Sequence, residues 1–154
     1  MLNPIFPRQA DNAYRGQKVA LWLLGIVVLL RLVMGANSTF NTYNVATTAD
    51  GIPINSYPEA AAQTILSLFA AIGLNYLLWA TLAIIVLIRY RTLVPMTFLL
   101  LLTGFLARRV QAEFLPVPTV GNPPAKVVTL VLLGLMIAGF ALSLWPRRSK
   151  DATP

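Results

Sequence analysis

The segment VALWLLGIVVLLRLVMGA, residues Val19 to Ala36, is apolar except for one arginine, Arg31. A run of this length can cross the hydrocarbon core of a bilayer as a helix. A guanidinium stays ionised there, and a charge at the centre of a span costs on the order of 3 kcal/mol. The segment therefore predicts a first membrane helix. Arg31 is either a candidate functional residue with a partner to be found, or a side chain that snorkels to lipid headgroups past the nearby Asn37.

The composition is that of an integral membrane protein. Apolar residues make up 57% of the 154 residues, charged residues only 11%, and the mean hydropathy is +0.71. The net charge of +7 predicts no nucleic-acid partner, because most basic residues flank apolar runs and are explained by membrane topology. The chain has neither Cys nor His, which removes disulfides, thiolate catalysis, haem ligation by histidine and the usual zinc and copper sites. We expect no metal, no cofactor and no enzymatic activity.

Three further apolar runs predict three further membrane helices. The second run follows Ser56-Tyr57-Pro58-Glu59, which fits a capping box with Ser56 as the cap. The fourth follows Asn122-Pro123, which fits a cap and a first-turn proline. A very short turn at residues 89–91 predicts that the second and third helices are antiparallel neighbours. The predicted fold is an all-α membrane protein, an antiparallel bundle of four transmembrane helices (approximate spans 19–36, 57–88, 92–114 and 123–145) between tails at 1–18 and 146–154.

The distribution of basic residues predicts the orientation of this bundle. Eight lie in the tails and in the turn between the second and third helices, and four lie toward the opposite side. Basic residues concentrate on the cytoplasmic side of membrane proteins. We therefore expect both termini in the cytoplasm, a polar extracytoplasmic loop between the first two helices (residues 37–57), and a multi-pass protein of the bacterial inner membrane.

This topology brings several charged residues to the extracytoplasmic side. Three arginines from two helices, Arg31, Arg108 and Arg109, fall at a similar depth there. Glu113 lies one helical turn after Arg109, and Asp50 and Glu59 belong to the polar loop and the start of the second helix. One interpretation is a closed ion-pair network that pins the loop over the bundle. The other is an anion site, in which the arginines leave donors free for a lipid phosphate, a carboxylate or another acidic amphiphile.

Other positions are candidates for helix packing. Asn75 falls near the middle of the second span, where an amide usually bonds to a neighbouring helix. In the fourth helix two pairs of small residues have the spacing that permits close helix approach, which favours packing within the chain over dimerisation. The pairs are Gly134 with Ala138 and Gly139 with Ser143.

Neither Gly-rich phosphate loops, nor nucleophile–base pairs, nor carboxylate pairs at catalytic spacing occur in the sequence. The sequence favours a non-enzymatic accessory or scaffold subunit that packs against membrane lipid and other membrane subunits, or against copies of itself. The alternative is a small binding or carrier protein for a lipid or acidic amphiphile, with the outer-side arginine cluster as its anion site.

Overall fold

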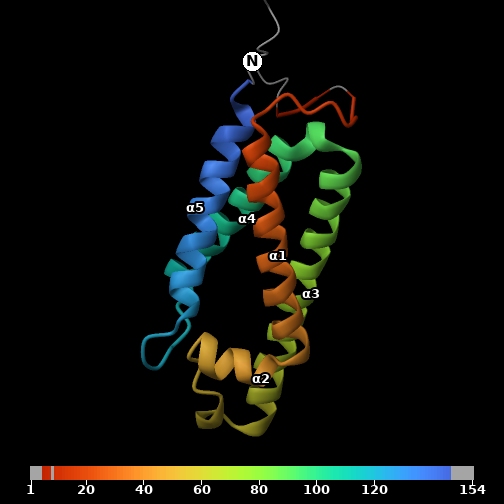
Figure 1. Ribbon diagram of the computed structural model, residues 1–154. Coiled ribbons are helices and arrows are strands. Elements are labelled where there is room, and N and C mark those ends of the chain that lie inside the picture. The colour runs from red at the N-terminus through yellow and green to blue at the C-terminus, as the bar shows by residue number, and fades with distance from the viewer. Residues whose placement is uncertain (1–4, 8, 147–154) are drawn as a thin grey trace, which may run out of the picture.

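The computed structural model describes residues 5–7 and 9–146, and it is helical (Figure 1). Four long helices carry the fold: α1 (Lys18–Phe40), α3 (Glu59–Arg89), α4 (Val94–Phe114) and α5 (Ala125–Leu144). Short helical segments join them: α2 (Thr42–Asn44), the π-helical η1 (Val45–Ala49), and the 3-10 turns η2 (Ile54–Ser56) and η3 (Arg91–Leu93). Residues 147–154 of the predicted tail at 146–154, and residues 1–4 and 8 of the predicted tail at 1–18, lie outside the described residues.

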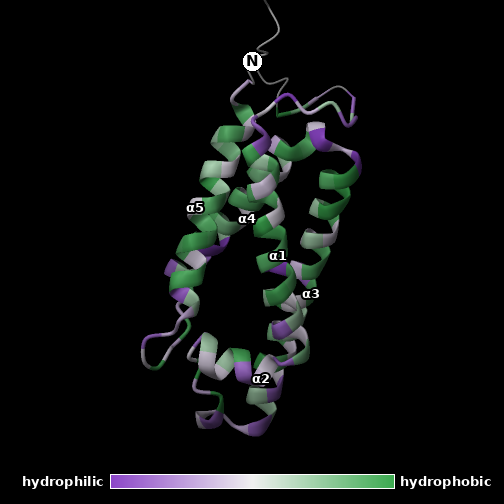
Figure 2. Ribbon diagram, viewed as in Figure 1, coloured by the Kyte–Doolittle hydropathy of each residue, from purple (hydrophilic) through white to green (hydrophobic). Residues whose placement is uncertain are grey.

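Each long helix is apolar enough to span a membrane. The most apolar windows of the four, with α4 counted from Arg91, have mean hydropathies of 2.4, 2.2, 1.6 and 2.5. Large apolar side chains are exposed along them, including Trp22 on α1 at 77% and Leu130 on α5 at 64%. Figure 2 shows that apolar residues dominate the middle of the helices and that polar residues gather toward their ends. An apolar outer surface of this kind suits lipid, so the fold indicates a membrane protein.

Consecutive long helices run antiparallel, and α1 lies at the centre of the bundle. In Figure 1, α1 lies between α3 and α5, and α4 lies behind them. Residues before α1, the turn between α3 and α4, and the end of α5 meet at one end of the bundle, which we call the terminal end. The opposite end, which we call the loop end, carries α2, η1, η2 and the connection at 115–124.

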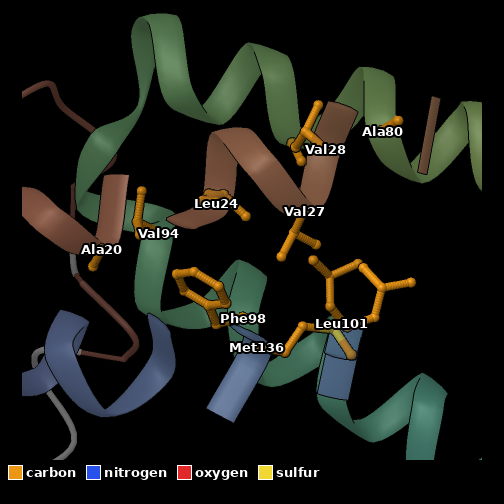
Figure 3. Close-up of a cluster of buried hydrophobic side chains, with 11 residues drawn as sticks. Ala20, Leu24, Val27, Val28, Ala80, Val94, Phe98, Leu101 and Met136 are labelled. Carbon is orange, nitrogen blue, oxygen red and sulfur yellow. The ribbon is translucent and has the colours of Figure 1, made fainter. Parts of the chain in front are cut away.

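The main hydrophobic core fills the terminal half of the bundle. Leu24 and Val27 of α1, Phe98 of α4 and Met136 of α5 are completely buried there (Figure 3). The Phe98 ring lies directly against Gly139, where a Cβ atom would collide with it. The predicted small residue Gly139 thus packs within the chain. A separate cluster of buried residues lies at the loop end, formed by Ala46, Ile52 and Ile54.

Two glycines bring α1 and α3 together. A Cβ atom on Gly73 of α3 would lie 2.8 Å from the backbone nitrogen of Thr39 and 2.9 Å from the carbonyl oxygen of Gly35. The two backbones therefore approach as closely as small residues permit in membrane helix pairs. This contact fixes α3 against α1 rather than against its sequence neighbour α4.

The second and third helices are antiparallel as expected, but neither is the main packing partner of the other. η3 reverses the chain between them as predicted, but α3 packs chiefly on α1, and α4 packs chiefly on α5. Away from their shared turn, α3 and α4 diverge toward the loop end.

Two predicted helix caps are also wrong. α3 begins at Glu59 after Pro58, without a side-chain cap, and the Ser56 hydroxyl donates to the Pro53 carbonyl at 2.7 Å. α5 begins at Ala125 after Pro124, again without a side-chain cap. In both cases a proline directly before the helix fixes the entering backbone, so no hydroxyl or amide cap is used.

The other packing candidates divide between the interior and the surface. Ser143 is buried, and its hydroxyl donates to the Phe140 carbonyl at 2.7 Å. Gly134 and Ala138 are exposed, and a Cβ on Gly134 would meet nothing within 4 Å. Asn75 is exposed on α3 instead of bonding a neighbouring helix, because the rotation of α3 set at Gly73 turns it outward.

The connection between α1 and α3 is more helical than the predicted polar loop. α1 continues past Ala36 to Phe40, and α2 and η1 follow after one residue. Gly51, with a φ of +69°, then turns the chain in a conformation that favours glycine. The Gly51 carbonyl accepts a hydrogen bond of 2.7 Å from the backbone N–H of Val120. This bond ties the α1–α3 connection to the α4–α5 connection across the loop end.

The segment before α1 packs against the terminal end. Thr92 in the α3–α4 turn accepts a hydrogen bond of 3.0 Å from the backbone N–H of Asp11, and its hydroxyl donates to the Asp11 carbonyl at 2.9 Å. The backbone N–H of Gln17 donates to the Leu142 carbonyl of α5. Residues 11–17 thus form part of the folded unit.

The burial of the Tyr14 hydroxyl in this segment should make the protein less stable at alkaline pH. Its hydroxyl is buried without a hydrogen-bond partner, and burial raises the pKa of Tyr14 from 10.0 to about 12. Because the folded state favours the neutral phenol, its contribution to stability is complete below pH 10 and declines as the pH rises toward 12. The thermal unfolding temperature of the wild type should therefore fall as the pH rises from 10 to about 12.

The variant Tyr14→Phe should unfold with a weaker dependence on pH in that interval. It should also be slightly more stable at neutral pH, since it removes an unsatisfied buried hydroxyl. Tyr43→Phe is the matched control, because the Tyr43 side chain is exposed at the loop end and should leave the alkaline slope of the wild type in place. Equal slopes for wild type and Tyr14→Phe would contradict this account.

Candidate functional site

Arg31, Tyr76 and Arg108 lie in one layer because of their positions along three helices. Arg31 is 13 residues from the start of α1, Tyr76 is 13 residues from the end of α3, and Arg108 is 14 residues from the start of α4. All three distances start at the terminal end, and at 1.5 Å per residue they place the three side chains about 20 Å from it. The layer lies directly beyond the main core, where α3 and α4 diverge.

A cavity of about 430 Å³ opens at this layer. Its polar lining comprises Arg31, Asn37, Ser38, Asp50, Tyr76, Arg108, Arg109 and Thr129, and apolar side chains of all four long helices complete the wall. Among these apolar residues, Val33 on α1 is 52% exposed and Val128 on α5 is 39% exposed. The arginine cavity, as we call it, is therefore open to the surface that the helices present to lipid.

Tyr76 lies between two guanidinium groups. Its ring centroid is 5.5 Å from the Arg31 Cζ and 5.7 Å from the Arg108 Cζ, distances at which a cation is attracted to an aromatic face. The Arg108 Nη1 also donates to the Tyr76 hydroxyl at 2.6 Å. The tyrosine thus links α1 and α4 across the gap and holds two positive charges near each other.

Arg31 has few partners of its own. Its Nη2 donates to the Met136 Sδ at 3.9 Å, and its Nε is buried without any hydrogen-bond partner. A guanidinium carries five N–H donors, and a thioether is only a weak acceptor. Met136 is completely buried in the main core, so Arg31 sits on the apolar floor of the cavity with most of its donors unused.

Asp50 is the acidic member of the cavity wall. It follows η1 at the loop end and is half-buried. Burial raises the pKa of the Asp50 carboxyl above its ordinary value, and the positive charge of Arg108 opposes that shift. Arg108 therefore interacts electrostatically with the Asp50 carboxyl, although the hydrogen bond of Arg108 goes to Tyr76.

The other two acidic candidates lie apart from the cavity. Glu59, in the first turn of α3, and Glu113, near the end of α4, are exposed and do not line it. Among residues 5–7 and 9–146, the polar contacts of Arg31 and Arg108 are a thioether and a phenol rather than a carboxylate. The closed ion-pair network expected from the sequence is therefore not formed in the described part of the chain.

The charges around the cavity do not balance. Three arginines and one aspartate line it, which leaves a net charge of +2 when Asp50 is ionised and +3 when it is protonated. Two of these arginines flank the same tyrosine, so their mutual repulsion is not relieved by an acid between them. An anion in the cavity would find unused guanidinium donors, and any attached apolar chain would find an apolar wall.

The sequence analysis missed two residues of this site, Tyr76 and Met136. Tyr76 is one of several aromatic residues of the second span, and only counting residues from the ends of the helices places it level with Arg31. Met136 carries no signal in the sequence, because an apolar residue in an apolar helix does not show which way it faces. In the described ranges, no group of three or more acidic residues is placed to hold a metal ion.

The fold and the site together define a class: a protein with four helices able to span a membrane and a cavity lined by arginines in its loop half. Comparisons with protein-family models, with curated proteins and with solved structures found no match for this chain.

Proposed function

We propose that this protein is a non-enzymatic, multi-pass membrane protein that binds an anionic amphiphile in the arginine cavity. The observation that carries the proposal is Arg31, whose buried Nε has no acceptor and whose side-chain hydrogen bond in the described part of the chain goes to a methionine sulfur, beside the Tyr76 ring. Burying an ion without a partner is costly. A bound anion is the simplest source of the missing acceptors, because a guanidinium binds phosphate and carboxylate oxygens in pairs.

The surroundings of the cavity favour an amphiphile over a small polar anion. Most of its wall is apolar, with Phe69, Ile72 and Phe105 among its members. Its exposed edges at Val33 and Val128 lie on helices whose outer surfaces suit lipid. A ligand with a charged head and an apolar chain can therefore place its head at the arginines and leave its chain along the apolar wall or in the bilayer.

The orientation predicted from the basic residues is part of the proposal. The terminal end would face the cytoplasm of a bacterial cell, and the loop end would face away from it. Arg31 would then lie about 20 Å from the cytoplasmic end of α1, nearer the opposite surface of a core about 30 Å thick. The cavity would thus open in the outer leaflet of the inner membrane.

The direct test is to purify the protein in a mild neutral detergent and to identify bound lipids by mass spectrometry. The wild type should retain an acidic amphiphile, and the double variant Arg108→Leu/Arg109→Leu should lose it. The double variant Arg89→Leu/Arg91→Leu is the matched control, since it removes the same charge at the terminal end, outside the cavity. The proposal would be refuted if both double variants retained the amphiphile, or if the wild type and both variants all lacked it.

The protonation of Asp50 should make anion binding in the cavity depend on pH. Its carboxylate faces the arginine cavity, whose other ionisable side chains are Arg31, Tyr76, Arg108 and Arg109. As the pH falls through the raised pKa of Asp50, the carboxyl becomes neutral and the cavity becomes more positive. Binding of an alkyl sulfonate, whose charge is constant between about pH 8 and about pH 4, should therefore tighten toward acid pH.

The variant Asp50→Asn should bind the sulfonate more tightly than the wild type at neutral pH and should lose this dependence on pH. Asp11→Asn, at the opposite end of the bundle, is the control and should bind as the wild type does. Weaker binding by Asp50→Asn would show that Asp50 supports the ligand site instead of competing with the ligand.

The accessory or scaffold function is the second candidate, favoured by one surface of α5. Gly134 and Ala138 are exposed there, and small residues one turn apart permit another helix to approach closely. The variant Gly134→Leu should then release co-purifying membrane subunits, or convert a homo-oligomer to a monomer, in the same mild detergent. If the chain remains a lone protein with bound lipid in both forms, the amphiphile-binding proposal stands by itself.

A further inference from the structure

The charge balance and the size of the arginine cavity narrow the class of ligand, given the amphiphile binding proposed above. From these two properties we infer that the ligand is a phosphate monoester carrying a single apolar chain. This inference rests on the proposed function and names the headgroup and the number of chains.

The headgroup follows from the unbalanced charge. Among the described residues, Arg31, Arg108 and Arg109 line the cavity together with one acid, Asp50, so the lining carries a net charge of +2 with the carboxyl ionised. A phosphate monoester carries a charge of about −1.5 to −2 at neutral pH, which balances this excess. A carboxylate carries one negative charge, and a phosphodiester also carries only one, so either would leave the cavity positive.

The donors around the cavity match three phosphate oxygens. Arg31 and Arg109 are among the lining residues, and Arg31 has its buried Nε unused. Arg108 uses Nη1 for Tyr76 and keeps its other N–H groups. The Tyr76 oxygen accepts that bond, so its own hydroxyl hydrogen is free to be donated. A carboxylate has two oxygens for these donors, whereas a monoester has three.

The single chain follows from the volume. A space of about 430 Å³ lies at the low end of the range of about 300–1,000 Å³ for sites of small ligands. It accommodates a phosphate and the first part of one chain beside Phe69, Phe105 and Leu132. The branched glycerol of a two-chain lipid would take up more of this volume beside the phosphate.

The test compares four probes with the full-length protein in nanodiscs of phosphatidylcholine. The probes are a 1-acylglycerol 3-phosphate, a fatty acid of equal chain length, a two-chain phosphatidic acid and inorganic phosphate, each measured at about pH 8 by calorimetry and by phosphorus NMR where phosphorus is present. We expect the affinity of the single-chain monoester to exceed that of each of the other three probes by about tenfold or more. Arg31→Leu should lose this preference, and Arg89→Leu should keep it.

The outcomes separate this inference from the function on which it rests. Equal or tighter binding of the fatty acid would overturn the monoester headgroup and leave amphiphile binding intact. Equal binding of phosphatidic acid would overturn the single chain, and equal binding of inorganic phosphate would show that the chain contributes nothing. Failure of all four probes to bind would overturn the proposed function together with the inference.

Discussion

Arg31→Leu should weaken the binding of an anionic amphiphile by about 10- to 100-fold and should make the ligand-free protein more stable. A hydrogen bond to a charged group contributes about 1.5–3 kcal/mol, which corresponds to about tenfold to 100-fold in affinity. Without ligand, however, Arg31 is a cation with a buried, unpartnered Nε. Replacing it by leucine removes a charge that costs on the order of 3 kcal/mol within a membrane span.

The opposite signs of these two effects distinguish a ligand site from a structural one. Binding can be measured by calorimetry with an alkyl sulfonate, and stability by thermal unfolding in the same detergent without ligand. Arg89→Leu, on the exposed end of α3, controls for the loss of a positive charge and should change neither quantity by much. A destabilised Arg31→Leu protein would indicate that Arg31 holds the bundle together, and unchanged values of both would indicate that it only snorkels to the headgroups.

The helices of this fold could be predicted from the sequence because length and hydropathy determine them. The predicted spans 57–88 and 92–114 end within one residue of where α3 and α4 end. The first predicted span, 19–36, is too short, because the polar residues Asn37 and Ser38 suggest the start of a loop. Within α1, which continues to Phe40, Thr39 donates its hydroxyl hydrogen to the Gly35 carbonyl one turn earlier, so this polar group is satisfied inside the helix.

The arrangement of the helices could not be predicted in the same way. All the long helices are apolar on nearly every face, so the periodicity of their sequences does not show which face is buried. The short turn between α3 and α4 suggested a packed pair. The structure instead places α3 on α1, where Gly35 and Gly73 permit a closer approach than any side chain would.

The charged residues of the candidate site could be predicted from the sequence, but Tyr76 and Met136 at its centre could not. Topology alone placed Arg31, Arg108 and Arg109 at one depth, and all three line one cavity with Asp50. Glu59 and Glu113 were assigned to the same group on the basis of side and spacing, but neither lines the cavity. The sequence gives the depth of a residue along a helix but not its direction around the helix, and that direction decides which of these groups meet.

Gly73→Leu should destabilise the protein by about 3 kcal/mol or more, the largest loss of stability that we expect from a single change. Overpacking a filled interior costs about 1–3 kcal/mol and sometimes more. At Gly73 the added atoms would meet the Thr39 nitrogen at 2.8 Å and the Gly35 carbonyl oxygen at 2.9 Å. Backbone atoms cannot turn aside as a flexible side chain can, so α1 and α3 would have to separate.

Gly104→Leu is the matched control, because Gly104 is an exposed glycine of α4 with nothing within 4 Å of its Cβ position. It should be neutral or slightly stabilising, since leucine favours a helix over glycine by up to about 1 kcal/mol. Unfolding of both variants can be followed by circular dichroism in detergent during heating. Separation of α1 from α3 would also move Arg31 away from Tyr76, so Gly73→Leu should weaken amphiphile binding while Gly104→Leu keeps it. Equal stability of the two variants would mean that α1 and α3 do not pack through Gly73, and the layer of Arg31, Tyr76 and Arg108 would lose its structural basis.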